Sequence, residues 1–152
     1  VRDSGARSIR IVRLGQTGEL PFAPIFDRVL VDAPCSGLGT IRRDPDIRWR
    51  RSESDLPRLA GQQLDLLLRA ASVVREGGRL VYATCSSEPE ENEQVVNAFL
   101  AARSGFSLVN LRAAGLSSAV TALVDERGMF RTLPFRDGLE AFFAAALRRG
   151  TI

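Results

Sequence analysis

Two cysteines are the residues of this sequence best suited to nucleophilic chemistry. Cys35 and Cys85 each follow a short apolar run and stand 50 positions apart. A thiolate is a strong nucleophile, and the partial positive charge of a helix N-terminus favours it. The chain contains neither histidine nor lysine, so a Cys-His arrangement is excluded and acid–base chemistry falls to Asp, Glu or the thiols. A second interpretation, in which both cysteines are small core residues, stays equally open on periodicity alone.

Acidic residues stand beside both thiols. Asp32 ends the first apolar run, and Ala33-Pro34 joins it to Cys35. The acid either caps a turn or works next to the thiol, and the proline between them, which restrains the backbone, favours the second interpretation. Four glutamates follow Cys85, and their negative charge would oppose formation of its thiolate if their side chains point toward the sulfur: Glu88, Glu90, Glu91 and Glu93.

An arginine-rich segment follows the first thiol directly. It carries Arg42, Arg43, Arg48 and the single tryptophan, Trp49. Arginine suits phosphate contacts, and an aromatic ring among cations is typical of nucleic-acid binding, although such a cluster is often only a solvated face. This segment is therefore the candidate nucleic-acid-binding region.

Length and composition indicate one ordinary globular domain. The chain has 152 residues, of which 45% are hydrophobic and 26% charged, with a net charge of +3. No apolar run is long enough to span a membrane, and two distant cysteines form neither a disulfide framework nor a zinc motif. We expect a cytoplasmic protein with reduced thiols and no metal site.

The elements that must position the thiols form a strand, helix and strand unit. Alternation predicts a strand over 8–14, and two buried strands are expected over 28–32 and 79–84. Helical spacing over 54–76, closed by Gly77-Gly78, places an amphipathic helix between the two buried strands. Such a unit makes the strands parallel with a right-handed crossover, so both thiols reach the carboxyl edge of the sheet, where α/β proteins place their chemistry.

The second half predicts a further helix and a closing strand pair. Ser87 and Glu90 form a capping-box pattern ahead of a helix that ends near Ser104-Gly105. A strand is expected over 106–111, and 112–126 is expected to be loop with a short helix. Segments 129–134 and 141–147 then indicate an antiparallel pair.

Both cysteine motifs together resemble one family, the Sun/Fmu-type RNA cytosine-5 methyltransferases. The match spans about 22–103 and rests on DAPCSGLGT (32–40), RRDPDIRW (42–49), GGRLVYATCS (77–86) and EENE (90–93). The resemblance implies an α/β fold: the C-terminal portion of a Rossmann-like methyltransferase sheet, mostly parallel with an antiparallel closing pair.

The family implies methyl transfer from S-adenosylmethionine to carbon 5 of a cytosine in ribosomal or transfer RNA. Cys85 is then the nucleophile that adds to carbon 6, and Cys35 assists product release. Asp32 lies near the cytosine and the donor, and the donor contacts are assigned to Asp32, Gln16 and Pro34. DNA cytosine methyltransferases use the Pro-Cys thiol instead, so the reverse assignment of the two cysteines is chemically possible.

Departures from the family concern the methyl donor. The family's glycine-rich donor loop and its ribose-binding acid lie upstream of anything in this chain, so residues 1–152 are expected to be the C-terminal part of one catalytic domain, inactive alone. Gln16 stands where the family usually has an adenine-contacting acid, and Glu140-Ala141 replaces an Asp-Gly. The alternatives are a non-catalytic RNA-binding or assembly module derived from such an enzyme, and a plain α/β domain with core cysteines.

Overall fold

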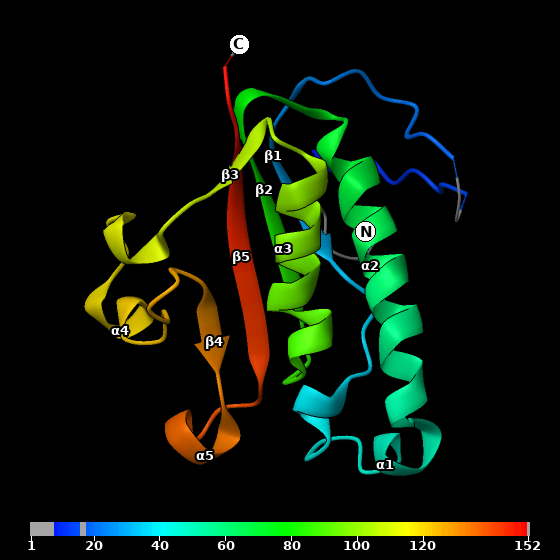
Figure 1. The fold of residues 1–152 in the computed structure, drawn as a ribbon, viewed down its shortest axis with the longest axis vertical. Coiled ribbons are helices and arrows are strands. Elements are labelled where there is room, and N and C mark those ends of the chain that lie inside the picture. Colours follow the sequence, from blue (N-terminus) through cyan, green and yellow to red (C-terminus); the bar gives the residue numbers. More distant parts are fainter. Residues whose placement is uncertain (1–7, 16–17, 152) are drawn as a thin grey trace.

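The computed structural model describes residues 8–15 and 18–151 and is built on one five-stranded sheet (Figure 1). Its strands are β1 Phe26–Asp32, β2 Val74–Thr84, β3 Phe106–Leu108, β4 Phe130–Thr132 and β5 Phe142–Arg149. The helices are α1 Ile47–Arg50, α2 Leu56–Ala71, α3 Glu93–Ala102, α4 Ser118–Thr121 and α5 Pro134–Asp137. Short 3-10 turns lie at Leu38–Thr40, Glu53–Asp55, Pro89–Glu91 and Leu111–Ala113.

The sheet has the order β1-β2-β5-β3, and β4 pairs with β5 beyond the end of β3. β1 and β2 are parallel, whereas β5 is antiparallel to β2, β3 and β4. Four of the five strands therefore run in one direction and β5 runs against them. This is the expected α/β sheet, mostly parallel in strand direction, with the predicted antiparallel pair at the end of the chain.

Two helices cover one face of the sheet and enclose the core (Figure 1). α2 and α3 pack against each other, and α2 also contacts β1 and β2. The inward residues of β2 alternate with outward ones, as the two-residue period of a strand requires. Large buried side chains at the centre of this layer are Leu67, Leu80, Tyr82, Phe99, Phe143 and Leu147. The core thus holds β1 and β2 rigidly side by side beneath the helices.

Three predictions about elements were wrong. Segment 8–14 forms no strand, because no strand of the sheet pairs with it, and its apolar side chains are exposed. The expected helix over 54–76 already ends at Ala71, and Val74, a β-branched residue, begins β2. The capping box is not formed: the Ser87 hydroxyl donates to Glu88 at 2.8 Å, and α3 begins only at Glu93.

β1 is less buried than its apolar sequence predicts. It is the edge strand of the described sheet, and the face of the sheet away from α2 leaves Leu30 66% exposed. Val31 points to the other face and is buried. Only the helix-covered side of β1 therefore belongs to the core of the described chain.

Candidate active site

The ends of β1 and β2 bring the two thiols into contact. Asp32 pairs with Ala83 in the parallel register, and the Ala33 N–H donates to the Ala83 carbonyl at 2.9 Å. The Sγ atoms of Cys35 and Cys85 consequently lie 2.9 Å apart, as free, half-buried thiols within hydrogen-bond distance. The expectation that both cysteines reach the same edge of the sheet is confirmed.

Gly39 allows the loop after Cys35 to cross the ends of the strands. Its N–H donates to the Cys85 carbonyl at 3.0 Å, and its carbonyl accepts from the Ala141 N–H at 3.0 Å. A Cβ at this position would lie 2.1 Å from the Ala141 oxygen and 2.7 Å from the Cys85 oxygen. Because any side chain would force these backbones apart, only glycine fits where the three segments meet.

The thiol contact makes the two cysteines electrostatically unequal. The hydrogen bond from Cys35 lowers the pKa of Cys85 to about 7, against burial and the charges of Asp32 and Glu91, which raise it. The same bond, together with burial, raises the pKa of Cys35 well above the ordinary thiol range. Within this coupled pair, ionisation is therefore favoured at Cys85 and disfavoured at Cys35.

A buried polar cluster underlies the thiols. The carboxylate of Glu91, which is fully buried, accepts from the Ser36 N–H at 2.8 Å, from the Ser36 and Ser86 hydroxyls at 2.5 Å each, and from Gln63 Nε2 at 2.9 Å. Asn92 accepts from the Thr84 hydroxyl at 2.6 Å and donates to the Ser86 carbonyl at 3.0 Å. The serine that follows each cysteine is thus fixed by hydrogen bonds to buried side chains.

The predicted donor-contacting residues lie on the open side of β1. Asp32 and Pro34 are exposed, and no hydrogen bond of the Asp32 carboxylate occurs in the described part of the chain, so the turn-cap interpretation lacks support. Pro34 borders a hollow of about 660 Å³ that Gly15 and the outer face of α2 also line. Gln16 lies outside the described residues.

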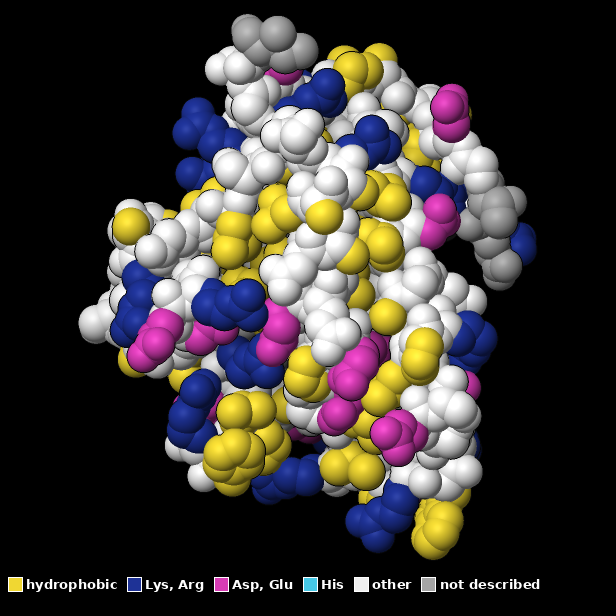
Figure 2. Space-filling view, in the orientation of Figure 1, with side chains coloured by type: hydrophobic (Ala, Val, Ile, Leu, Met, Phe, Trp, Pro, Cys, Tyr) yellow, Lys and Arg dark blue, Asp and Glu magenta, His cyan; other side chains and the backbone are white. Residues whose placement is uncertain are grey.

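The arginine-rich segment lies at the thiol end of the sheet, on α1 and the loop before it. Trp49 is 82% exposed, and neither Arg42 nor Arg48 has an ion-pair partner among the described residues. Arg43 Nε lies 2.7 Å from Glu140 Oε1, a contact that joins this loop to the one before β5. Figure 2 shows dark blue side chains along this end of the molecule, below the helices. Arg42, Arg48 and Trp49 are therefore free to contact a polyanion, whereas Arg43 already pairs with Glu140.

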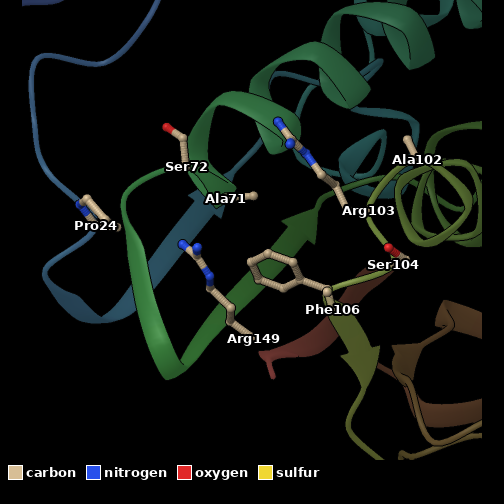
Figure 3. A pocket seen from close by; sticks show the side chains of 9 residues that line it. Pro24, Ala71, Ser72, Ala102, Arg103, Ser104, Phe106 and Arg149 are labelled. Atoms are coloured by element: carbon tan, nitrogen blue, oxygen red, sulfur yellow. The ribbon is translucent and has the colours of Figure 1, made fainter. Parts of the chain in front are cut away.

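A second hollow lies at the opposite end of the sheet, away from the thiols. Arg103, Phe106 and Arg149 surround it (Figure 3), and Arg149 donates to the Val74 carbonyl at 2.7 Å. No cysteine and none of the acids near the thiols lines it. The chemistry-bearing side chains are therefore gathered at the other end.

Two other features of the described residues concern metals and membranes. No group of three or more Cys, Asp or Glu side chains there could hold a metal ion. No helix in the same part of the chain has the length and apolar character needed to cross a bilayer.

Sequence reasoning missed the supporting residues rather than the thiols. In the sequence, Glu91 stands out only as one of the acids after Cys85 and within the EENE motif, and Gln63 is one polar position inside the helix expected over 54–76. A signal was present in the EENE segment and in the serine after each cysteine, but a hydrogen-bond network between residues 55 positions apart is visible only in the folded chain.

The sheet, the covering helices and the paired strand-end thiols form an α/β structure of the Rossmann-like class, with a candidate active site at the ends of its strands. The family model described as "16S rRNA methyltransferase RsmB/F" matches residues 5–148, and the chain belongs to this family, whose members depend on S-adenosylmethionine. The resemblance seen in the cysteine motifs is thereby confirmed.

Relatives and solved structures agree with this assignment. The chain is 40% identical over 124 residues to the Bacillus subtilis strain 168 protein named "Probable ribosomal RNA small subunit methyltransferase B", covering 82% of this chain and 28% of that protein. It is 55% identical over 75 residues to "Ribosomal RNA small subunit methyltransferase B" of Escherichia coli O1:K1, covering 49% of this chain and 18% of the relative.

Two solved structures are similar in fold. The crystal structure of PH0851 has a TM-score of 0.73 and 38% identity, over 84% of this chain and 27% of that one. The structure of NSun6 from Pyrococcus horikoshii with SFG has a TM-score of 0.62 and 29% identity, over 81% and 30% respectively. The chain thus spans less than a third of the length of these relatives.

Proposed function

We propose that this chain forms the thiol-bearing part of an S-adenosylmethionine-dependent enzyme that methylates carbon 5 of a cytosine in ribosomal or transfer RNA. The observation that carries the proposal is the 2.9 Å contact between Cys35 and Cys85 at the carboxyl ends of two parallel strands. A thiol with a pKa of about 7 beside a second thiol that keeps its proton suits covalent catalysis better than a core role does.

In the proposed reaction the Cys85 thiolate adds to carbon 6 of the cytosine, forming a sulfur–carbon bond and making carbon 5 nucleophilic. The bound donor supplies a methyl group on a positively charged sulfur, and carbon 5 takes it. A base, water or a carboxylate of the site, then takes the carbon 5 proton, which restores the double bond and expels the Cys85 thiolate. A Cys35 thiol within 2.9 Å of that sulfur assists the release by donating a hydrogen bond to it.

Asp32 and Pro34 fit one wall of a donor site. Their exposure on the open side of β1 and the hollow beside Pro34 support this assignment, and an exposed carboxylate can face either the ring of the cytosine or the positive charge of the donor. The donor's remaining contacts, with Gln16 as the candidate near the adenine, are proposed to come from outside the described residues and from upstream parts of the domain.

The first test asks which atom is methylated and whether the isolated chain is active by itself. The full-length natural protein, supplied with labelled donor and RNA transcripts, is expected to yield 5-methylcytidine after nuclease digestion. The isolated 152-residue chain is expected to give no turnover, because it offers one wall of the donor site only. Methylation at another atom would overturn the assigned reaction. Robust turnover by the isolated chain would overturn the proposal that the donor site needs residues from outside it.

The second test concerns the RNA contacts of Arg42, Arg43, Arg48 and Trp49. Replacing Arg48 and Trp49 together by alanine is expected to weaken RNA binding about 10- to 100-fold and to flatten its salt dependence, because a phosphate contact and a base-stacking ring are removed. Filter binding at several salt concentrations measures both effects.

The matched control is Arg103→Ala, an exposed arginine at the opposite end of the sheet (Figure 3). It removes the same charge and is expected to leave the affinity within about 2-fold. Equal losses in both variants would show that only net charge matters, and no loss in the double variant would remove the arginine-rich segment from the interface.

A further inference from the structure

Glu91 occupies a position that is costly for a carboxylate. It is fully buried, yet no arginine in the described part of the chain pairs with it, and four hydrogen bonds from neutral groups satisfy its two oxygens. A buried ionised group without a counter-ion persists only where hydrogen bonds replace its lost hydration. Such a group calls for an explanation beyond packing.

Its hydrogen bonds connect the two thiol loops. Ser36, which follows Cys35, donates its N–H to one oxygen and its hydroxyl to the other. Ser86, which follows Cys85, donates its hydroxyl to the second oxygen as well. One carboxylate therefore bridges the residues adjacent to both nucleophilic sulfurs.

The bridge is anchored from the core side. Gln63 of α2 donates to the Glu91 carboxylate at 2.9 Å and to the Pro34 carbonyl at 3.1 Å. The Tyr82 hydroxyl donates to the Glu91 carbonyl at 2.6 Å and lies 3.1 Å from Gln63 Oε1. Both the side chain and the backbone of Glu91 are thus fixed relative to β1, β2 and α2.

We propose that Glu91 is a positioning residue that sets the separation of the Cys35 and Cys85 sulfurs by tying Ser36 to Ser86. The inference goes beyond the proposed function, since it concerns the thiol pair itself and holds whichever base or RNA the enzyme modifies.

The charge of Glu91 raises the pKa of Cys85, so a positioning role and an electrostatic role of Glu91 predict opposite effects on that pKa. The groups that face Cys85 are Cys35, whose hydrogen bond lowers its pKa, and Asp32 and Glu91, whose charges raise it. A Glu91 that acted through its charge alone would therefore hinder the nucleophile. A Glu91 that acts as a bridge favours the thiolate by keeping the Cys35 donor in place.

The substitution Glu91→Gln removes the charge of the side chain but can keep its hydrogen bonds to both loops. The amide oxygen would accept the two N–H donors, from Ser36 and Gln63, that now share Oε1. The amide nitrogen would donate to the Ser36 and Ser86 hydroxyl oxygens that now bond to Oε2. Alanine removes the bridge altogether.

The experiment follows alkylation of Cys85 by iodoacetamide between pH 5 and 10, in this chain and in its variants, with mass spectrometry to assign the site. Glu91→Gln is expected to leave the midpoint near pH 7 or lower it. Glu91→Ala is expected to raise the midpoint toward about 8.5, the ordinary thiol value, because the Cys35 donor is no longer held against Cys85.

Two further variants keep the test decisive. The double variant Ser36→Ala/Ser86→Ala removes both hydroxyl links while leaving the carboxylate. The alkylation midpoint of Cys85 in this variant is expected to rise. It replaces Glu91→Ala as the test if circular dichroism shows Glu91→Ala to be unfolded. Glu88→Gln removes a neighbouring charge whose carboxylate accepts from the Ser87 hydroxyl and has no bond to Ser36 or Ser86, and it is expected to leave the midpoint unchanged. An unchanged midpoint in the folded bridge-breaking variants, or an equal rise in Glu91→Gln, would overturn the proposal.

Discussion

Replacing Cys85 by alanine is expected to abolish methyl transfer by the full-length protein, with a loss of more than about 10³-fold, because no other group can take over addition to carbon 6. The sulfur of Cys35 lies only 2.9 Å away in the wild type. In Cys85→Ala the hydrogen bond that most raises the pKa of Cys35 is lost, but burial still raises that pKa and disfavours a replacement thiolate at Cys35. RNA containing 5-fluorocytosine supplies the clearest readout, since fluorine at carbon 5 blocks the final elimination and traps the covalent adduct. Wild-type protein should form the adduct, and Cys85→Ala should not.

Cys35→Ala is the matched variant for this experiment. It removes the neighbouring thiol but leaves the proposed nucleophile, so the adduct should still form, and slow release should let it accumulate even on ordinary RNA. Loss of the adduct in Cys35→Ala together with its retention in Cys85→Ala would exchange the roles of the two cysteines.

The second large effect is on the pH dependence of Cys85. In the wild type the Cys35 hydrogen bond holds the pKa of Cys85 at about 7, so about half of it is thiolate at neutral pH. In Cys35→Ala this donor is lost while burial and the charges of Asp32 and Glu91 remain, so the midpoint of alkylation should rise to about 8.5 or above. At pH 7 the thiolate fraction should then fall at least about 10-fold.

Cys35→Ser provides the control, because a hydroxyl also donates a hydrogen bond to a neighbouring thiolate. Its midpoint is expected to lie between those of the wild type and Cys35→Ala. A midpoint in Cys35→Ala that stays near 7 would show that the helix end or the backbone, rather than the neighbouring thiol, lowers the pKa of Cys85.

Much of the framework was predictable because local patterns encode it directly. The apolar runs before Cys35 and Cys85 with a helix between them specify two parallel strands, and parallel strands must deliver their carboxyl ends to one edge. The wrong prediction for segment 8–14 shows the limit of such patterns: the segment alternates like a strand, yet a strand exists only where another strand pairs with it, and none of the described strands does so.

By itself, the sequence determined the α/β class, the pairing of two thiol motifs and the arginine-rich segment beside them, since residue type and spacing along the chain are enough for these. Only the tertiary structure decided that the two thiols are unequal, because a 2.9 Å contact and the charges around it lower the pKa of Cys85 and raise the pKa of Cys35. It also revealed Glu91 as a buried bridge between the two thiol loops rather than only an acid that opposes the thiolate. Burial and hydrogen bonding between distant residues follow from packing, and packing has no signature in local periodicity.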